Sequence, residues 1–133
     1  MNTILQPDGW VKPLGYANGV AAEGRHVFVG GQIGWNAQSQ FESDDLVEQT
    51  RQALTNILEV LAVAGGKSEH ITAMTWYLVD KQEYLARLKE IGQAYRDVIG
   101  RHFPAMAAVQ VVALIEDRAK IEIQANAVIP KSP

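Results

Sequence analysis

The stretch Arg101-His102-Phe103-Pro104-Ala105-Met106 joins a helical pattern to the start of a strand pattern. The helical pattern ends at Gly100, a natural helix stop, and the strand pattern covers residues 107–114. Met106 stands between two alanines, and methionine is a flexible apolar side chain that fills cores and pocket walls. We therefore expect Met106 to face either the interior of the molecule or the floor of a ligand pocket.

Two helices are predicted upstream of this stretch. Apolar residues recur at helical spacing over 44–64, where Ser43 can cap the helix and Gly65-Gly66 ends it. A second helix is expected from about 82 to 99, with Asp80 at its start in a spacing typical of a capping box.

Five strands complete the predicted fold, and a glycine-centred connection at 23–25 suits a hairpin between the first two. The element order is ββαβαββ, an α+β fold with both helices on one face of the sheet. Several strands carry apolar residues at odd and even positions, so both sheet faces need burial. Another copy of the chain is the simplest cover for the second face, although a ligand pocket could hide part of it. The strands are expected at 16–22, 26–32, 71–79, 107–114 and 120–129.

Composition limits the class of protein. The chain has 133 residues, 47% of them hydrophobic, and we expect one domain over 1–133. It has no cysteine, which excludes a disulfide framework, a thiolate nucleophile and a cysteine-based metal site. No signal peptide or membrane-spanning stretch is recognisable, so we expect a cytoplasmic protein without a membrane partner.

Charge and histidine spacing argue against nucleic acid and metal. The formal net charge is -3 at pH 7, and the twelve Lys and Arg residues are scattered rather than gathered in a basic patch. Arg96, Arg101 and His102 form one local cluster, which we interpret as a solvated helix end. His26, His70 and His102 have no second ligand at metal-binding spacing. We expect no metal, and no cofactor motif is present.

Four segments of the chain form a recognisable set of motifs. They are Gly15-Tyr16-Ala17-Asn18-Gly19-Val20, Val27-Phe28-Val29-Gly30-Gly31-Gln32-Ile33, Pro104-Ala105 and Lys120-Ile121-Glu122-Ile123. In order and spacing they resemble the Rid (YjgF, RidA) family of small enamine and imine deaminases, also called endoribonuclease L-PSP, and the resemblance covers nearly the whole chain. It implies a chorismate-mutase-like α+β fold, assembled as a homotrimeric barrel with ligand clefts between subunits.

The resemblance also implies a set of cleft residues. Glu122 corresponds to the glutamate that, with a tyrosine matched by Tyr16, positions the water that releases ammonia. Gly31 and Gln32 correspond to a Gly-Gln pair of the substrate-binding wall. Trp35, just beyond them, is interpreted either as a stacking wall for an aromatic ligand or as a loop anchor.

Three residues depart from the family pattern. Met106 stands where the family has the arginine that grips the substrate carboxylate, Gly30 where it has serine, and Gly92 where it often has asparagine. Each could be an ordinary packing residue. Together they predict a roomier, more apolar pocket that lacks the bidentate charge partner. Whether Arg101 or His102 replaces that charge is left open.

These features predict a cofactor-free hydrolase that releases ammonia from a reactive imine or enamine and prefers a bulkier substrate than 2-aminoacrylate. Glu122 could instead be a solvent-facing residue beside Gln124 and Asn126, and Tyr16 could merely pin a turn. The alternative is a non-catalytic trimer that binds a small metabolite in the same cleft. A third hypothesis, a ribonuclease or translation inhibitor as reported for some family members, gains little support from the acidic charge balance.

Overall fold

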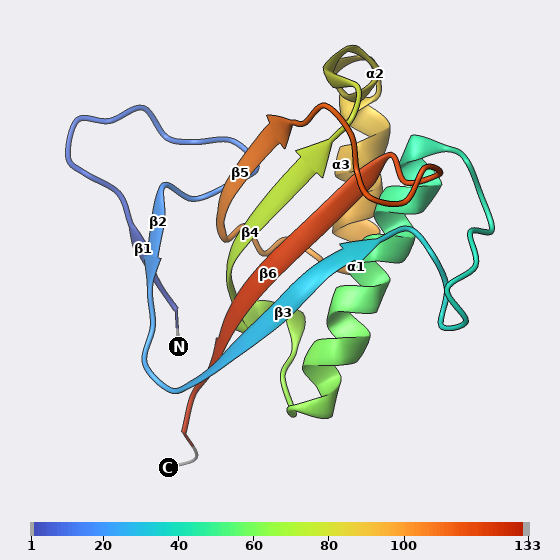
Figure 1. Ribbon diagram of the computed structural model, residues 1–133. Coiled ribbons are helices and arrows are strands. Elements are labelled where there is room, and N and C mark those ends of the chain that lie inside the picture. The colour runs from blue at the N-terminus through green and yellow to red at the C-terminus, as the bar shows by residue number, and fades with distance from the viewer. Residues whose placement is uncertain (1, 132–133) are drawn as a thin grey trace.

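The structure is a computed structural model that describes residues 2–131, so both ends of the predicted 1–133 domain lie just outside the described residues. Within residues 2–131 the chain forms a two-stranded sheet, a four-stranded sheet and three α-helices (Figure 1). The fold is a mixed α+β fold. In chain order the elements are β1 (Thr3–Leu5), β2 (Gly19–Ala21), β3 (Arg25–Ile33), α1 (Leu46–Val63), the 3-10 helix η1 (Ser68–His70), β4 (Ile71–Leu78), α2 (Lys81–Ala86), α3 (Leu88–Val98), β5 (Ala105–Gln110) and β6 (Ile121–Ile129).

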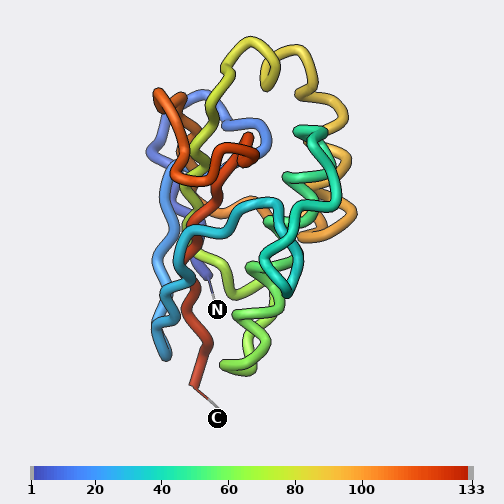
Figure 2. Tube along the Cα trace, turned by 45° about the vertical axis from the view of Figure 1, so that its right-hand side comes forward, coloured from blue at the N-terminus to red at the C-terminus, as the bar shows by residue number. Residues whose placement is uncertain are grey.

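The four-stranded sheet places the helices on one side. Its order is β3-β6-β4-β5, in which β4 and β5 run parallel and the other two pairs run antiparallel. Because parallel neighbours need a crossover connection, α2 and α3 link β4 to β5. The long helices α1 and α3 pack on one sheet face, and the β1–β2 ribbon lies on the opposite side (Figure 2). This arrangement confirms the prediction that the helices cover one face.

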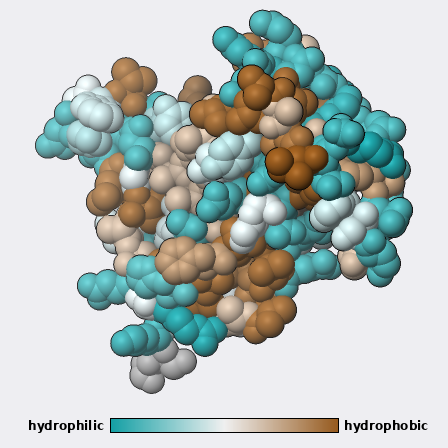
Figure 3. All heavy atoms as spheres, in the orientation of Figure 1, coloured by the Kyte–Doolittle hydropathy of each residue, from teal (hydrophilic) through white to brown (hydrophobic). Residues whose placement is uncertain are grey.

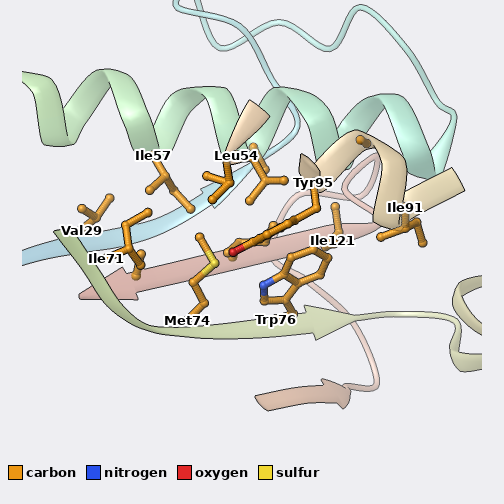
Figure 4. Close-up of a cluster of buried hydrophobic side chains, with 14 of the residues drawn as sticks. Val29, Leu54, Ile57, Ile71, Met74, Trp76, Ile91, Tyr95 and Ile121 are labelled. Carbon is orange, nitrogen blue, oxygen red and sulfur yellow. The ribbon is translucent and has the colours of Figure 1, made fainter. Parts of the chain in front are cut away.

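The core lies between this sheet face and the two long helices. Alternating residues of β4 and β6 point into it, among them the buried Met74, Trp76 and Ile121, and α1 contributes Leu54 and Ile57 (Figure 4). Each fully buried large aliphatic side chain of this kind contributes roughly 1.5–3 kcal/mol by leaving water.

One buried polar side chain connects helix α1 to the segment that leads into β6. Gln49 of α1 donates through Nε2 to the carbonyl oxygens of Ser43 and Arg118, at 3.1 and 3.0 Å, and accepts from the backbone N–H of Lys120 at 2.8 Å. Gly34 lies so close that a Cβ there would be 2.5 Å from the Gln49 Cβ. Since every polar atom of the buried amide is used, the start of β6 is held in a fixed position.

The predicted hairpin between residues 16–22 and 26–32 is wrong. β2 pairs with β1, with Ile4 opposite Val20, whereas β3 pairs with β6. Gly24 has φ +147°, and a Cβ there would lie 2.1 Å from the carbonyl oxygen of Ile129, so the connection presses against the end of β6. The unpredicted strand β1 supplies the partner of β2.

The helix starts also differ from the prediction. The single helix expected over 82–99 is divided at Arg87, which has non-helical backbone angles and serves both as the end of α2 and as the start of α3. Asp80 caps α2 as predicted. Asp45, rather than Ser43, caps α1, because the Ser43 hydroxyl accepts from the Asp45 backbone N–H instead.

The segment that links α3 to β5 begins, as predicted, with a glycine that ends the helix. Gly100 follows α3 with φ +90°, a conformation that glycine adopts easily at a helix end. β5 begins at Ala105, two residues before the predicted start, and ends at Gln110. Val112 and Ile115, beyond the strand, are 105% and 95% exposed.

The sheet face away from the helices is less apolar than the sequence pattern suggested. Strand β6, which is second in the sheet order, presents Glu122, Gln124 and Asn126 on this face. The apolar residues of the face lie on the two edge strands. Phe28 of β3 is 75% exposed and Val109 of β5 is 44% exposed. Figure 3 views this side, where hydrophobic patches alternate with hydrophilic ones. The open face therefore combines a polar strand with two apolar borders.

Candidate functional site

A cavity of about 560 Å³ lies between α3 and the β4–β5 edge of the sheet, under the segment that carries Tyr16. Register explains the space: Met106 of β5 pairs with Met74, and the small Ala108 pairs with the large Trp76. The wall is mostly apolar and aromatic. It consists of Leu14, Gly15, Tyr16, Trp76, Tyr84, Leu88, Ile91, Gly92, Tyr95, Arg96, Phe103, Met106, Ala107 and Ala108.

Aromatic packing stiffens the inner wall. The Tyr95 ring stacks on Phe103 with centroids 5.6 Å apart and lies 6.2 Å from the Trp76 ring (Figure 4 shows Tyr95 over Trp76). The Tyr95 hydroxyl donates to the carbonyl oxygen of His102. Burial raises the pKa of the Tyr95 hydroxyl, and likewise that of Tyr84, above the ordinary value of 10, so both stay neutral near pH 7.

One donor in this wall lacks an acceptor. Among residues 2–131, the indole nitrogen Nε1 of Trp76 is a buried side-chain atom that makes no hydrogen bond. Trp76 itself is 2% exposed. The inner wall therefore contains one buried N–H donor that no acceptor of the described chain uses.

Arg96 is the charged residue of the cavity wall. A Cβ placed on Gly92, one helical turn earlier, would lie 3.3 Å from Nη1 of Arg96, so the guanidinium lies over the bare glycine backbone. Arg101 is exposed, and Nε2 of His102 lies 2.7 Å from the carbonyl oxygen of Ile71. Of the three basic residues in this cluster, the structure brings Arg96 to the cavity.

A second cluster of predicted site residues lies where β3 bulges against β6. Val29 pairs with Ala125 and Gln32 with Ile123, so two residues of β3 stand opposite one of β6. Those two residues are Gly30 and Gly31. The bulge is the local reason that two consecutive glycines occur inside this strand.

Glu122 uses the space that the bulge leaves. A Cβ on Gly31 would lie 2.1 Å from Oε2 of Glu122, so the carboxylate rests directly on the glycine. Gln32 donates from Nε2 to the carbonyl oxygen of Gly30 at 3.2 Å. The cluster thus presents a half-buried carboxylate beside exposed backbone groups, an arrangement that can bind and orient water.

Trp35 has a different surrounding. Its ring lies 5.9 Å from the Phe41 ring, and Asn56 donates to its carbonyl oxygen at 2.8 Å. These contacts agree with the loop-anchor interpretation. Trp35 borders a separate shallow hollow with Gln32 rather than the aromatic cavity.

The predicted site residues therefore fall into two clusters and one outlier. Tyr16, Gly92 and Met106 line the aromatic cavity. Gly30, Gly31, Gln32 and Glu122 gather at the β3–β6 bulge. The sequence reasoning missed Arg96 as a cavity residue, although its spacing of four from Gly92 placed both on one helix face.

The described residues lack two further features, a metal-binding cluster and a membrane-spanning helix. Residues 2–131 contain no group of three His, Asp or Glu side chains placed to hold a metal ion. Among the same residues, no helix has the length and apolar character needed to cross a membrane.

Solved structures share this architecture. YyfB from Yersinia pestis, a protein of unknown function of the conserved Rid family, superposes with a TM-score of 0.85 at 29% identity, covering 96% of this chain and 98% of that one. E. coli TdcF with bound serine superposes with a TM-score of 0.68 at 29% identity, with the same shares of the two chains covered. The class defined by the fold is thus the Rid-like α+β fold.

Sequence comparison gives the family. The model described as Endoribonuclease L-PSP matches residues 12–129. The goat (Capra hircus) protein named 2-iminobutanoate/2-iminopropanoate deaminase is 35% identical over 105 residues, which cover 78% of this chain and 73% of the goat protein. The chain belongs to the endoribonuclease L-PSP family, which confirms the resemblance recognised from its sequence motifs.

Proposed function

We propose that this protein is an imine deaminase whose active cleft forms between the subunits of a homotrimer. The supporting observation is that the family's cleft residues lie in two separate clusters of one chain, one around Met106 and one around Glu122. Two half-sites on one chain are useful if a symmetric neighbour brings the second half to the first. The exposed apolar edges at Phe28 and Val109 provide surface for that contact.

The proposed chemistry is hydrolysis of a carbon–nitrogen double bond. Glu122 accepts a proton from a water molecule as the water oxygen adds to the imine carbon, and the π electrons move to nitrogen. Return of that proton to nitrogen gives a carbinolamine. Transfer of the hydroxyl proton to nitrogen then allows the carbon–oxygen double bond to form as the carbon–nitrogen bond breaks, which leaves a carbonyl product and ammonia. The reaction consumes water and needs no redox partner. Tyr16, at the mouth of the aromatic cavity, is placed to orient the substrate.

The name of the goat relative supports this reaction class, and the glutamate at the bulge supplies a base for it. The runner-up function is a binding trimer without catalysis. The apolar cavity floor at Met106 favours that alternative, because no arginine fixes the substrate carboxylate at this strand.

Turnover of an imine generated in situ tests the proposal. We expect a bulky aromatic imine to be hydrolysed faster than 2-aminoacrylate, with release of keto acid above the spontaneous rate. Glu122→Gln is expected to lower kcat/KM by about 100-fold or more, since it removes the general base. Glu69→Gln, on the exposed 3-10 helix, is the matched control. Equal rates in the wild type and Glu122→Gln would contradict the assigned mechanism.

A further inference from the structure

We propose that Arg96 binds the carboxylate of the ligand, and that the ligand is an imino acid, or its keto-acid product, with an aromatic or large apolar side chain. The reaction assigned to this ligand rests on the proposed function above. The binding role of Arg96 stands on the geometry of the cavity.

The position of the guanidinium is the first observation. Arg96 lines the cavity, with its Nη1 over Gly92. Glycine inside a helix costs about 1 kcal/mol relative to alanine, so a packing or functional reason is expected for it. Here the missing side chain leaves the space in which the guanidinium lies against the helix.

The second observation is that the guanidinium of Arg96 has unused hydrogen-bond donors. Three other arginines pair with carboxylates: Arg51 with Asp97 at 3.0 Å, Arg87 with Asp45 at 2.9 Å and Arg118 with Asp44 at 2.9 Å. Within residues 2–131, Arg96 has no carboxylate within 4.0 Å, and its side chain makes one long bond of 3.3 Å to Oε1 of Gln93. Its guanidinium fork remains free for a carboxylate from outside the chain.

The rest of the wall sets the chemistry of the ligand. Trp76, Phe103 and Met106 contribute largely apolar side chains to the wall, and Ala108 leaves room beside Trp76. A volume of about 560 Å³ is large for a three-carbon acid and suits a ligand with a ring or a branched chain. A single cation at one place in an apolar cavity fits a ligand with one carboxylate and a large apolar group.

Binding of phenylpyruvate tests the inference without turnover. Isothermal titration calorimetry would compare phenylpyruvate, its uncharged isostere phenylacetone, and pyruvate. We expect Arg96→Gln to weaken phenylpyruvate binding about 10- to 100-fold, as loss of a charge-assisted bond predicts, and to leave phenylacetone binding unchanged. Arg96→Lys should retain part of the affinity, because the charge remains but the planar fork is lost. The control is Arg101→Gln, an exposed arginine nearby in the sequence.

A second variant excludes misfolding as the cause of weaker phenylpyruvate binding. Gly92→Ala introduces a Cβ at 3.3 Å from Nη1 of Arg96 and should weaken phenylpyruvate binding several-fold. The same change should raise helix stability, so a misfolded chain cannot explain the loss. Equal phenylpyruvate affinity in the wild type, Arg96→Gln and Gly92→Ala would overturn the inference, as would pyruvate binding as tightly as phenylpyruvate.

The two proposals fail in different experiments. Arg96-dependent phenylpyruvate binding without imine turnover would support the inference and contradict the deaminase function. Turnover of an aromatic imine with an unchanged KM in Arg96→Gln would support the function and overturn the inference.

Discussion

Gly31 is the residue on which the carboxylate cluster depends. A Cβ at this position would lie 2.1 Å from Oε2 of Glu122, so any other residue type would displace that carboxylate. We predict that Gly31→Ala lowers kcat/KM at least tenfold while changing the free energy of unfolding by less than about 1 kcal/mol, because the position is exposed. Imine turnover and urea unfolding measure the two effects.

The neighbouring glycine provides the stability control. A Cβ on Gly30 meets no atom within 4 Å, so Gly30→Ala adds a methyl group to the same bulge without displacing Glu122. If Gly31→Ala retained full turnover, Glu122 would not need its observed position for the reaction.

At the residue scale, alignment with the family motifs placed Tyr16, Gly92 and Met106 near a ligand pocket. All three line the aromatic cavity, while their roles in ligand binding stay predictions. Arg96 was interpreted as part of a solvated helix end, because sequence does not show that β5 leaves a cavity beside that turn of α3. The two basic residues considered as replacements lie elsewhere.

At the scale of elements, one ion pair joins the start of α1 to the division between α2 and α3. The Asp45 carboxylate accepts from the backbone N–H of Glu48 at 3.1 Å and from Nη1 of Arg87 at 2.9 Å. The Arg87 hydrogen bond lowers the pKa of Asp45 below its ordinary value of 3.8. One side chain therefore caps a helix and connects two helical segments.

This geometry predicts a pH-dependent contribution to stability. Asp45→Ala should reduce the free energy of unfolding at pH 7 by about 1–2 kcal/mol, as loss of a helix cap does. Because the folded-state pKa is lowered, the contribution of the charge is complete above the ordinary value of 3.8 and disappears as pH falls through the lower folded value. Urea unfolding of both proteins at pH 7 and at pH 3 should show a smaller difference in acid.

Asp44→Ala is the matched control for this measurement. The Asp44–Arg118 pair has side chains that are 72% and 52% exposed, and such surface pairs contribute about 0–1 kcal/mol. An equal loss from both substitutions, or a difference that grows in acid, would contradict the cap assigned to Asp45.

Element boundaries were predictable where the residues that set them lie close together in sequence. A strand was expected over 71–79 and β4 spans Ile71–Leu78, and Asp80 caps the following helix. The sequence pattern did not predict the division at Arg87, whose side chain pairs with Asp45, 42 residues away in sequence. It did not predict the pairing of β2 with β1 either, because that pairing depends on backbone contacts between separate segments.

At the scale of the whole molecule, the two residue clusters make assembly testable. We predict that light scattering at micromolar concentration gives three times the 14.6 kDa mass of one chain. Purified mixed trimers of Tyr16→Ala and Glu122→Gln chains should recover roughly a third of the wild-type sites, because each cleft would take its halves from two subunits and one of the three clefts would combine two intact halves. Co-expression with two affinity tags allows purification of the mixed species for assay.

The activity of the mixed trimers distinguishes active sites shared between subunits from active sites formed within one subunit. A stable monomer, or mixed trimers no more active than either parent, would contradict a cleft between subunits. The exposed Phe28 and Val109 provide a further check, since both should become protected from solvent in a trimer.

The sequence by itself determined the family, the α+β class and the helix-covered sheet face, because motif spacing and apolar periodicity are local properties of the chain. Tertiary structure alone decided which residues share a site. The pairing of Ala108 with Trp76 opens the aromatic cavity, and the bulge at Gly30 and Gly31 brings Glu122 onto bare backbone. Both depend on strand register between segments far apart in sequence, and a shift of one residue would turn each side chain to the opposite face.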